Sequence, residues 1–258
     1  MLGSIIGDII GSTYEFRNAD SYDFNPFPPG SDFTDDTVLT IAIADAILNN
    51  RDYTETVKEY ALNYPRRGYG GWFNEWIYMD NPKPYNSFGN GSAMRVSPIG
   101  WAFNSIEKTL DEASKSAAIT HNHSEGIKGA QAVAAIIFLA RNGKCKKEIK
   151  RYVSTNFSYN IDRTLTEIKP FYNFNETCQR TVPEAIICFL ESDNFHDAIR
   201  KAIWLGGDSD TMACITGGIA EAFYKEIPDQ WMKMAHSILD AKLNAIVERF
   251  QKTYSFKN

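Results

Sequence analysis

The feature that most restricts the fold of this chain is a repeat of apolar residues every three to four positions along most of its length. Such spacing places apolar side chains on one face of an α-helix. The segments with this pattern are 37–50, 53–64, 105–119, 123–143, 146–157, 182–192, 194–207, 208–224 and 229–250. Strand-like alternation is confined to a short extended piece that residues 16–26 could hold. We therefore predict a single all-α domain over residues 1–258, with roughly ten helices.

Charge and cysteine usage restrict the class of protein further. The formal net charge of −5 argues against general binding to nucleic acid, which needs a basic surface. The four cysteines show no CxxC spacing, which favours free thiols in a reducing compartment over disulfides. The apolar start of the chain lacks a basic flank and is interrupted by Asp8, unlike a signal peptide. The apolar run 132–140 is too short to span a bilayer. We expect a cytoplasmic protein that does not bind membranes and is a monomer.

Two acidic motifs precede predicted helices. Each one, "FTDDT" or "GGDSDT", is by itself typical of a helix start, where threonine caps and acids suit the helix dipole. Capping needs one oxygen, however, and four carboxylates brought together would repel one another without cations. Because Mg²⁺ prefers oxygen ligands, the pair of motifs predicts a hard-cation site with room for two ions. The candidate ligands are Thr34, Asp35, Asp36, Asp208, Asp210 and Thr211.

Zinc is a weaker alternative at this site. The cysteines are scattered along the chain, and His121 and His123 have no further nitrogen or sulfur ligands near them in the sequence. Either histidine could instead satisfy a local carbonyl group.

Two further motifs suggest chemistry. The N-terminal stretch has glycines at positions 3, 7 and 11, typical of close packing, and its acids Asp8 and Glu15 need a partner or a function. In "FGNGSAMRVSPIG" (88–100), backbone N–H groups at a helix start suit an anion such as a diphosphate. Arg95 is interpreted either as a phosphate partner or as part of a buried ion pair.

Five motifs occur together in a characteristic order: "GDIIGSTYE", "TDDT", "GNGSAMRVSPIG", "THNHSEGIKGAQA" and "GGDSDT" followed by "GGIAEAFY". In this order they resemble the ADP-ribosylglycohydrolase family, from about residue 3 to about residue 224. The resemblance implies an all-α fold, a single orthogonal multi-helix bundle with a dinuclear metal cleft that holds two Mg²⁺ or Mn²⁺ ions.

The resemblance also implies roles for individual residues. Thr34, Asp35, Asp36, Asp208, Asp210 and Thr211 match the metal motifs. Glu15 lies beside the metals in the family's motif, and we predict that Glu15 and Asp36 are catalytic, with Asp8 as structural support. The positions that match the loop and the histidine around ADP-ribose are Gly89, Asn90, Gly91, Ser92, Arg95 and His121. Residues 144–180 match no motif.

The activity implied is hydrolysis of the glycosidic bond between ADP-ribose and an acceptor, which is a protein side chain, a nucleobase or a small molecule. The sequence leaves the acceptor and the choice between Mg²⁺ and Mn²⁺ open. An aromatic side chain such as Tyr69, Tyr85 or Phe88 could stack on the adenine. Two alternatives are a non-catalytic ADP-ribose-binding protein and a metal-dependent nucleotide phosphohydrolase.

Overall fold

The computed structural model describes residues 1–19 and 21–254 and confirms the all-α prediction. Residue 20 and residues 255–258 of the predicted domain lie outside the described residues. Within the described part, no β-strand forms, and the β-type pairing is an isolated bridge between Gly89 and Thr177. The short extended piece expected within residues 16–26 forms no strand at the positions described there, which are bends and irregular segments. No described helix combines the length and apolar character that a membrane span requires.

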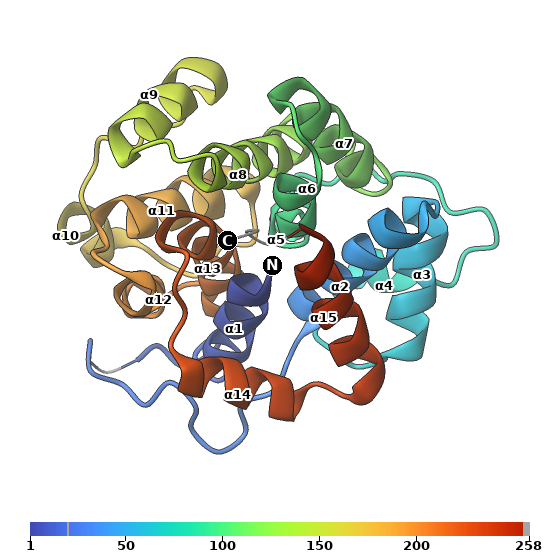
Figure 1. Ribbon diagram of the computed structural model, residues 1–258, viewed down its shortest axis with the longest axis horizontal. Coiled ribbons are helices and arrows are strands. Elements are labelled where there is room, and N and C mark those ends of the chain that lie inside the picture. Colours follow the sequence, from blue (N-terminus) through green and yellow to red (C-terminus); the bar gives the residue numbers. More distant parts are fainter. Residues whose placement is uncertain (20, 255–258) are drawn as a thin grey trace.

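Fifteen α-helices and one 3₁₀-helix form in the described part of the chain (Figure 1). They are α1 (Leu2–Gly11), α2 (Asp35–Asn49), α3 (Tyr53–Asn63), α4 (Gly71–Trp76), α5 (Gly91–Met94), α6 (Ser97–Ala102), α7 (Ile106–Ala118), α8 (Ser124–Arg141), α9 (Lys146–Phe157), α10 (Leu165–Ile168), η1 (Lys169–Phe171), α11 (Cys178–Glu191), α12 (Phe195–Leu205), α13 (Ser209–Tyr224), α14 (Asp229–Ile238) and α15 (Ala241–Tyr254).

The expectation of roughly ten helices is too low for two physical reasons. Helices α4, α5, α6 and α10 have four to six residues, too few for an apolar repeat to show. The segment 229–250, predicted as one helix, is divided into α14 and α15. At the break, Asp240 Oδ1 accepts a hydrogen bond from the Leu243 backbone N–H at 2.9 Å and so caps the start of α15.

The centre of the molecule is the packing of α1 against α13. All ten residues of α1 are buried. Its glycines allow the two backbones to approach closely, since a Cβ on Gly7 would lie 2.0 Å from the Ala213 carbonyl oxygen. The contact brings the C-terminal end of α1 beside the N-terminal end of α13, because a Cβ on Gly11 would lie 2.4 Å from the Asp210 Cα.

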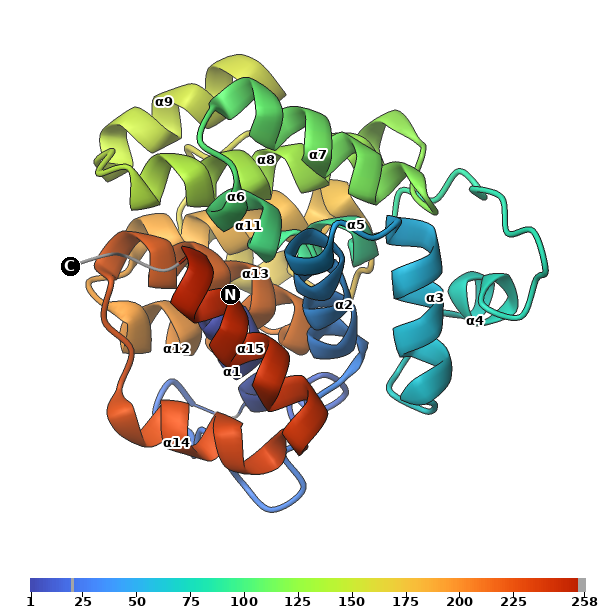
Figure 2. The same cartoon turned by 45° about the vertical axis from the view of Figure 1, so that its right-hand side comes forward.

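The other helices surround this pair in several directions (Figures 1 and 2). Helix α2 packs against α1, α3, α6 and α15, while α8 packs against α7, α6, α11 and α13. Both figures show α7, α8 and α9 together at the top and α14 across the bottom. The result is that the N-terminal ends of α2 and α13 and the C-terminal half of α1 meet inside one bundle.

Candidate active site

Asp8, on α1, holds the start of α2. Its Oδ2 accepts hydrogen bonds from the backbone N–H groups of Thr34 and Thr37, each at 3.0 Å. Its Oδ1 accepts from the Thr34 hydroxyl at 2.7 Å. The carboxylate therefore caps a helix that follows it by more than 25 residues in the chain. This is the structural support expected of Asp8.

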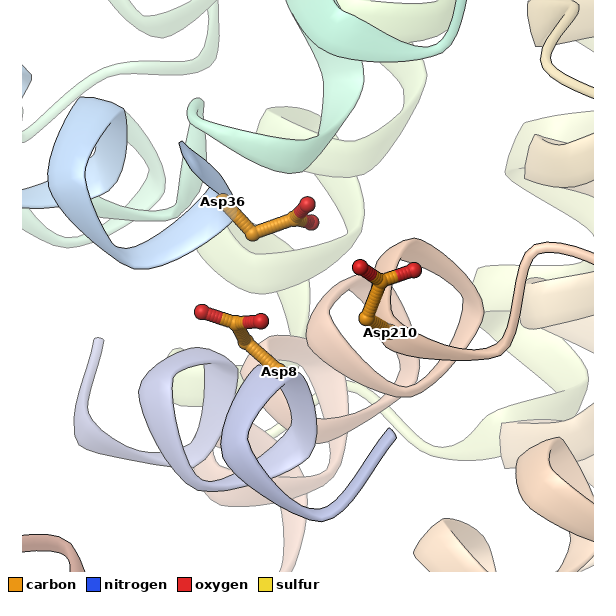
Figure 3. Close-up of side chains that lie close together, drawn as sticks. All are labelled: Asp8, Asp36 and Asp210. Carbon is orange, nitrogen blue, oxygen red and sulfur yellow. The ribbon is translucent and has the colours of Figure 1, made fainter. Parts of the chain in front are cut away.

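Asp36 enters the site from the first turn of α2 and is buried. Its Oδ2 accepts a hydrogen bond from the Thr211 hydroxyl of α13 at 3.2 Å, between residues 175 positions apart. Its Oδ1 is buried and has no hydrogen-bond partner among the described residues. Figure 3 shows the carboxylates of Asp8, Asp36 and Asp210 directed toward one another from α1, α2 and α13. A buried carboxylate oxygen without a partner is costly unless a ligand satisfies it.

The start of α13 is shaped by two glycines. Gly206 and Gly207 have φ values of 81° and 84°, in the left-handed region that other residues rarely adopt. This turn places Asp208 and Asp210 in the interior, where Asp208 Oδ2 accepts a hydrogen bond from Asn90 Nδ2 at 2.7 Å. The two glycines therefore let the chain turn its acids inward.

The carboxylates form two overlapping groups. One oxygen from each of Asp8, Asp36 and Asp210 lies within 4.8 Å of the others, and the same holds for Glu15, Asp208 and Asp210. Asp210 belongs to both groups and so joins them into one acidic cluster. The sequence missed that Asp8 offers an oxygen to this cluster. Its position seven residues before Glu15 was the available signal.

Three predicted ligands lie at the edge of this cluster. The hydroxyls of Thr34 and Thr211 contact Asp8 and Asp36 respectively. Asp35 belongs to neither carboxylate group, but it faces the same pocket and lies near Gly68, where a Cβ would be 3.3 Å from its Oδ1. The structure thus places all six predicted ligand positions at one site, with Asp8 and Glu15 beside them.

Burial and mutual repulsion disfavour the charged form of the carboxylates in the acidic cluster. Burial first, and then the neighbouring carboxylates, raise the pKa of Asp35, Asp36 and Asp210 well above its ordinary value. Burial likewise raises the pKa of Asp8 and of Asp208 to about 6. For Glu15, burial and the charges of Asp210, Asp8 and Glu176 raise the pKa to about 8.

Positive side chains do not neutralise these carboxylates in the described part of the chain. Across the described chain, no Lys or Arg forms an ion pair with any carboxylate of the cluster. The oxygen-only donors and the orphaned Asp36 Oδ1 fit hard divalent cations. Soft sulfur or nitrogen ligands for zinc are missing from both carboxylate groups.

The cluster lies in a pocket of about 730 Å³. Its lining includes the predicted positions Glu15, Asp35, Asp36, Gly89, Asn90, Gly91, Arg95, His121, Asp208, Asp210 and Thr211. Two predicted residues lie behind the lining. Thr34 supports Asp8, and the fully buried Ser92 hydroxyl donates to the Gly126 carbonyl at 2.7 Å. Ser92 therefore positions the loop through its side chain.

The glycine loop is fixed from two directions. The Asn90 backbone N–H donates to the Glu176 carbonyl at 2.7 Å, and the Cys178 N–H donates to the Phe88 carbonyl at 2.9 Å. The Asn90 side chain bridges to Thr181 and Asp208. Residues 174–177, from a region without any recognised motif, thereby become part of the pocket wall.

Aromatic residues line the pocket beside this loop. Tyr85 and Phe88 do so, as two of the three adenine-stacking candidates. The third, Tyr69, is not part of the lining and stacks instead on Phe73, with ring centroids 5.5 Å apart. Trp72, which is 72% exposed, also lines the pocket and was missed, although it follows the glycine-rich stretch "GYGG".

Arg95 and His121 form a wall with hydrogen-bond donors. Arg95 is fully buried, and its Nη2 donates to the Ser116 carbonyl and to the Thr120 hydroxyl, both at 2.9 Å. Within the described residues it forms no ion pair, so the ion-pair interpretation of Arg95 lacks a partner. His121 is 5% exposed and contacts the Thr120 hydroxyl through Nδ1 at 2.7 Å. The pocket lining thus carries hydrogen-bond donors as well as carboxylates.

Comparison with known proteins agrees with this architecture. A model of the ADP-ribosylglycohydrolase family matches residues 1–256. The chain is 28% identical to ADP-ribosylhydrolase ARH3 of Homo sapiens, covering 90% of this chain and 87% of that protein. It is 26% identical to ADP-ribosylarginine hydrolase Tri1 of Pseudomonas putida, covering 90% and 72% respectively. A solved structure titled "ADP-ribosylglycohydrolase-related protein complex" has the same fold, with a TM-score of 0.75, 22% identity and coverage of 99% and 96%.

Fold and site together define an all-α protein with a cluster of carboxylates where the ends of three helices meet. The chain belongs to the ADP-ribosylglycohydrolase family. It is accordingly a glycohydrolase enzyme.

Proposed function

We propose that this enzyme cleaves the glycosidic bond between the anomeric carbon of ADP-ribose and an acceptor, with the help of two divalent cations, Mg²⁺ or Mn²⁺. The observation that carries the proposal is the pair of carboxylate groups that share Asp210 and that form no ion pair with a Lys or Arg among the described residues. Asp8, Asp36 and Asp210 would hold one cation, and Glu15, Asp208 and Asp210 the other. When bound, such cations lower the pKa of water and polarise substrate oxygens, which favours hydrolysis near neutral pH.

The chain's own groups have separable tasks in this proposal. Glu15 lies at the edge of the cluster and is only half-buried, so it can exchange protons with solvent. It is the group best placed to hold or release a proton at the attacking water or at the leaving acceptor. Asp36, fixed by Thr211, orients groups bound at the anomeric carbon. Positive charge develops on the sugar in glycosidic cleavage, and the surrounding carboxylates stabilise it.

The glycine loop beside the cluster suits the ADP part of the substrate. The N–H groups of Gly89 and Asn90 already donate to the Ser87 hydroxyl and the Glu176 carbonyl. The diphosphate contact proposed for this loop therefore falls on the N–H groups of Gly91 and Ser92, with the Arg95 charge behind them. Tyr85, Trp72 or Phe88 offers an aromatic face for adenine.

The test is a panel of substrates with ADP-ribose on arginine, serine or a nucleobase, assayed with Mg²⁺ or Mn²⁺ and after chelation. We expect free ADP-ribose as the product from at least one substrate, and loss of turnover in the chelated enzyme. Release of inorganic phosphate in place of ADP-ribose would support the phosphohydrolase alternative. Binding of ADP-ribose without any turnover would support the non-catalytic alternative.

A further inference from the structure

Arg95, Thr120 and His121 form a continuous hydrogen-bonded chain in the donor wall of the pocket. Arg95 Nη2 and Thr120 Oγ1 are 2.9 Å apart, and Thr120 Oγ1 and His121 Nδ1 are 2.7 Å apart. Arg95 and Thr120 are fully buried. The backbone carbonyl of Thr120 also accepts from the N–H groups of Tyr85 and Ser87. Thr120 thus connects the arginine, the histidine and the aromatic segment of the pocket.

The direction of each hydrogen bond follows from the chemistry of the groups. A guanidinium only donates, so the Thr120 oxygen accepts from Arg95. Within the described residues, His121 Nδ1 is the only acceptor that hydrogen-bonds to the Thr120 hydroxyl. The single proton of the Thr120 hydroxyl is then directed to His121 Nδ1. An accepting Nδ1 carries no proton, so the ring proton lies on Nε2.

The surroundings of His121 keep the ring neutral. Burial, and then the positive charge of Arg95, lower the pKa of His121 well below its ordinary value. In the described part of the chain no carboxylate hydrogen-bonds to the ring. A neutral imidazole with an accepting Nδ1 has one N–H group left to offer.

That N–H group faces the glycine loop. A Cβ on Gly91 would lie 3.2 Å from His121 Nε2, and a Cβ on Gly89 would lie 3.5 Å from it. Both positions lack a side chain, so the space beside Nε2 stays open. Nε2 has no hydrogen-bond partner within the described residues, although the ring lines the pocket.

We propose that Thr120, itself oriented by Arg95, is a positioning residue that fixes His121 as a neutral imidazole protonated at Nε2, ready to donate to an oxygen of the ADP-ribose moiety. The identity of this ligand rests on the proposed function. In this state His121 Nε2 can neither bind a cation nor act as a base. It is a fixed donor that recognises a hydroxyl or phosphate oxygen.

The first test reads the tautomer directly by nitrogen-15 NMR of the histidine side chains in the full-length protein. We expect His121 to be neutral at pH 7, with the proton on Nε2, and Thr120→Ser to preserve this state. Thr120→Val, which keeps the shape but removes the hydroxyl, should give a mixture of tautomers or the Nδ1-protonated form. A proton on Nδ1 in the unaltered protein, or an unchanged tautomer in Thr120→Val, would overturn the proposal.

The second test measures the affinity for ADP-ribose by calorimetry. Thr120→Val should bind about tenfold more weakly, as expected for one lost hydrogen bond, and Thr120→Ser should restore the affinity. Thr109→Val is a matched control, because Thr109 is also fully buried and its hydroxyl donates to the Ser105 carbonyl within α7. This control should lower thermal stability without changing affinity or tautomer. Equal affinity of Thr120→Val and the unaltered protein would contradict the positioning role.

These readouts separate failure of this inference from failure of the proposed function. Neither one needs turnover, so a protein that binds ADP-ribose without cleaving it would still show the Thr120 effect. If the enzyme cleaves its substrate and Thr120→Val binds normally, only the positioning role fails.

Discussion

At the scale of single residues, Asp210 is the most connected group of the candidate active site. It contributes an oxygen to both carboxylate groups, whereas Asp36 belongs to one of them. The neighbouring Asp45 is a matched contrast, because it is also buried on α2 but forms an ion pair with Arg51 at 2.9 Å. A buried acid with a cation beside it is balanced, whereas the site carboxylates have no such partner in the part of the chain that the structure describes.

We predict that Asp36→Asn and Asp210→Asn each lower turnover on the order of 10³-fold or more and reduce the Mg²⁺-dependent rise in melting temperature. The reason is that each removes a negative charge on which cation binding depends. Asp45→Asn should lower the melting temperature but leave that Mg²⁺-dependent rise intact. Full activity in either site variant would refute the shared centre.

Glu15 differs from the other acids because it is half-buried and has a pKa of about 8. We predict that Glu15→Gln lowers kcat about 100-fold, since an amide keeps the shape but cannot transfer a proton. Asp8, Asp36 and Asp210 remain, so calorimetry should still detect the binding of at least one Mg²⁺. Glu248→Gln, on the exposed side of α15, serves as the control and should leave kcat unchanged. A normal kcat in Glu15→Gln would remove Glu15 from the chemistry.

At the scale of elements, the site depends on how closely α1 approaches α13. A Cβ on Gly3 would lie 2.4 Å from the Gly217 carbonyl oxygen, and one on Gly217 would lie 2.2 Å from the Gly3 carbonyl oxygen. These contacts are with backbone atoms, which cannot move aside as a flexible side chain can. The interpretation of the N-terminal glycines as close-packing residues is therefore confirmed.

We predict that Gly7→Ala destabilises the protein by about 3 kcal/mol or more, because the new methyl group would overlap the Ala213 carbonyl. Denaturant unfolding measures this change. Gly71→Ala is the control, since nothing lies within 4 Å of its Cβ position and its φ is ordinary. A Gly7→Ala protein as stable as Gly71→Ala would show that α1 and α13 are less closely packed than described.

The helices also show which structural features a local sequence pattern predicts. Apolar repeats predicted the long helices, and the two acidic motifs predicted the starts of α2 and α13. The helix start expected within residues 88–100 falls at α5, but no apolar repeat could show the short helix α4. The positions of both helices, which carry pocket residues, depend on contacts made elsewhere in the fold. Asn90 at the start of α5, for instance, is held by Glu176, Thr181 and Asp208.

At the scale of the whole molecule, the bundle concentrates negative charge in its interior. In the folded protein the pKa of Asp8 and of Asp208 is about 6 and that of Glu15 about 8, above the value of about 4 for an unfolded chain. Between these values the unfolded chain binds fewer protons than the folded one. The stability contributed by these groups is therefore present at low pH and is lost as pH rises from about 4 to about 8.

We predict that the melting temperature of chelator-treated protein contains a component that falls between pH 5 and pH 8. At pH 8, Mg²⁺ well above its dissociation constant should raise the melting temperature on the order of 5 °C, because binding stabilises the folded state. Calorimetric scans of the Asp36→Asn, Asp210→Asn double variant test this assignment. The fall in melting temperature between pH 5 and pH 8 should be smaller there, because the charge of Asp210 no longer raises the pKa of Glu15. A melting temperature that is independent of Mg²⁺ at pH 8 would contradict the cation site.

What the sequence by itself determined are the properties that depend on near neighbours in the chain. Helical periodicity established the all-α class, and the paired acids "TDDT" and "GGDSDT" predicted that their carboxylates share one site. Only the tertiary structure decided that Asp8 joins this site, that Asp210 is shared, and that Thr120 links Arg95 to His121. These depend on distances between residues far apart in the chain, such as Asp36 and Thr211, 175 positions apart. The packing of α1, α2 and α13 determines those distances, and no local pattern in the sequence predicts them.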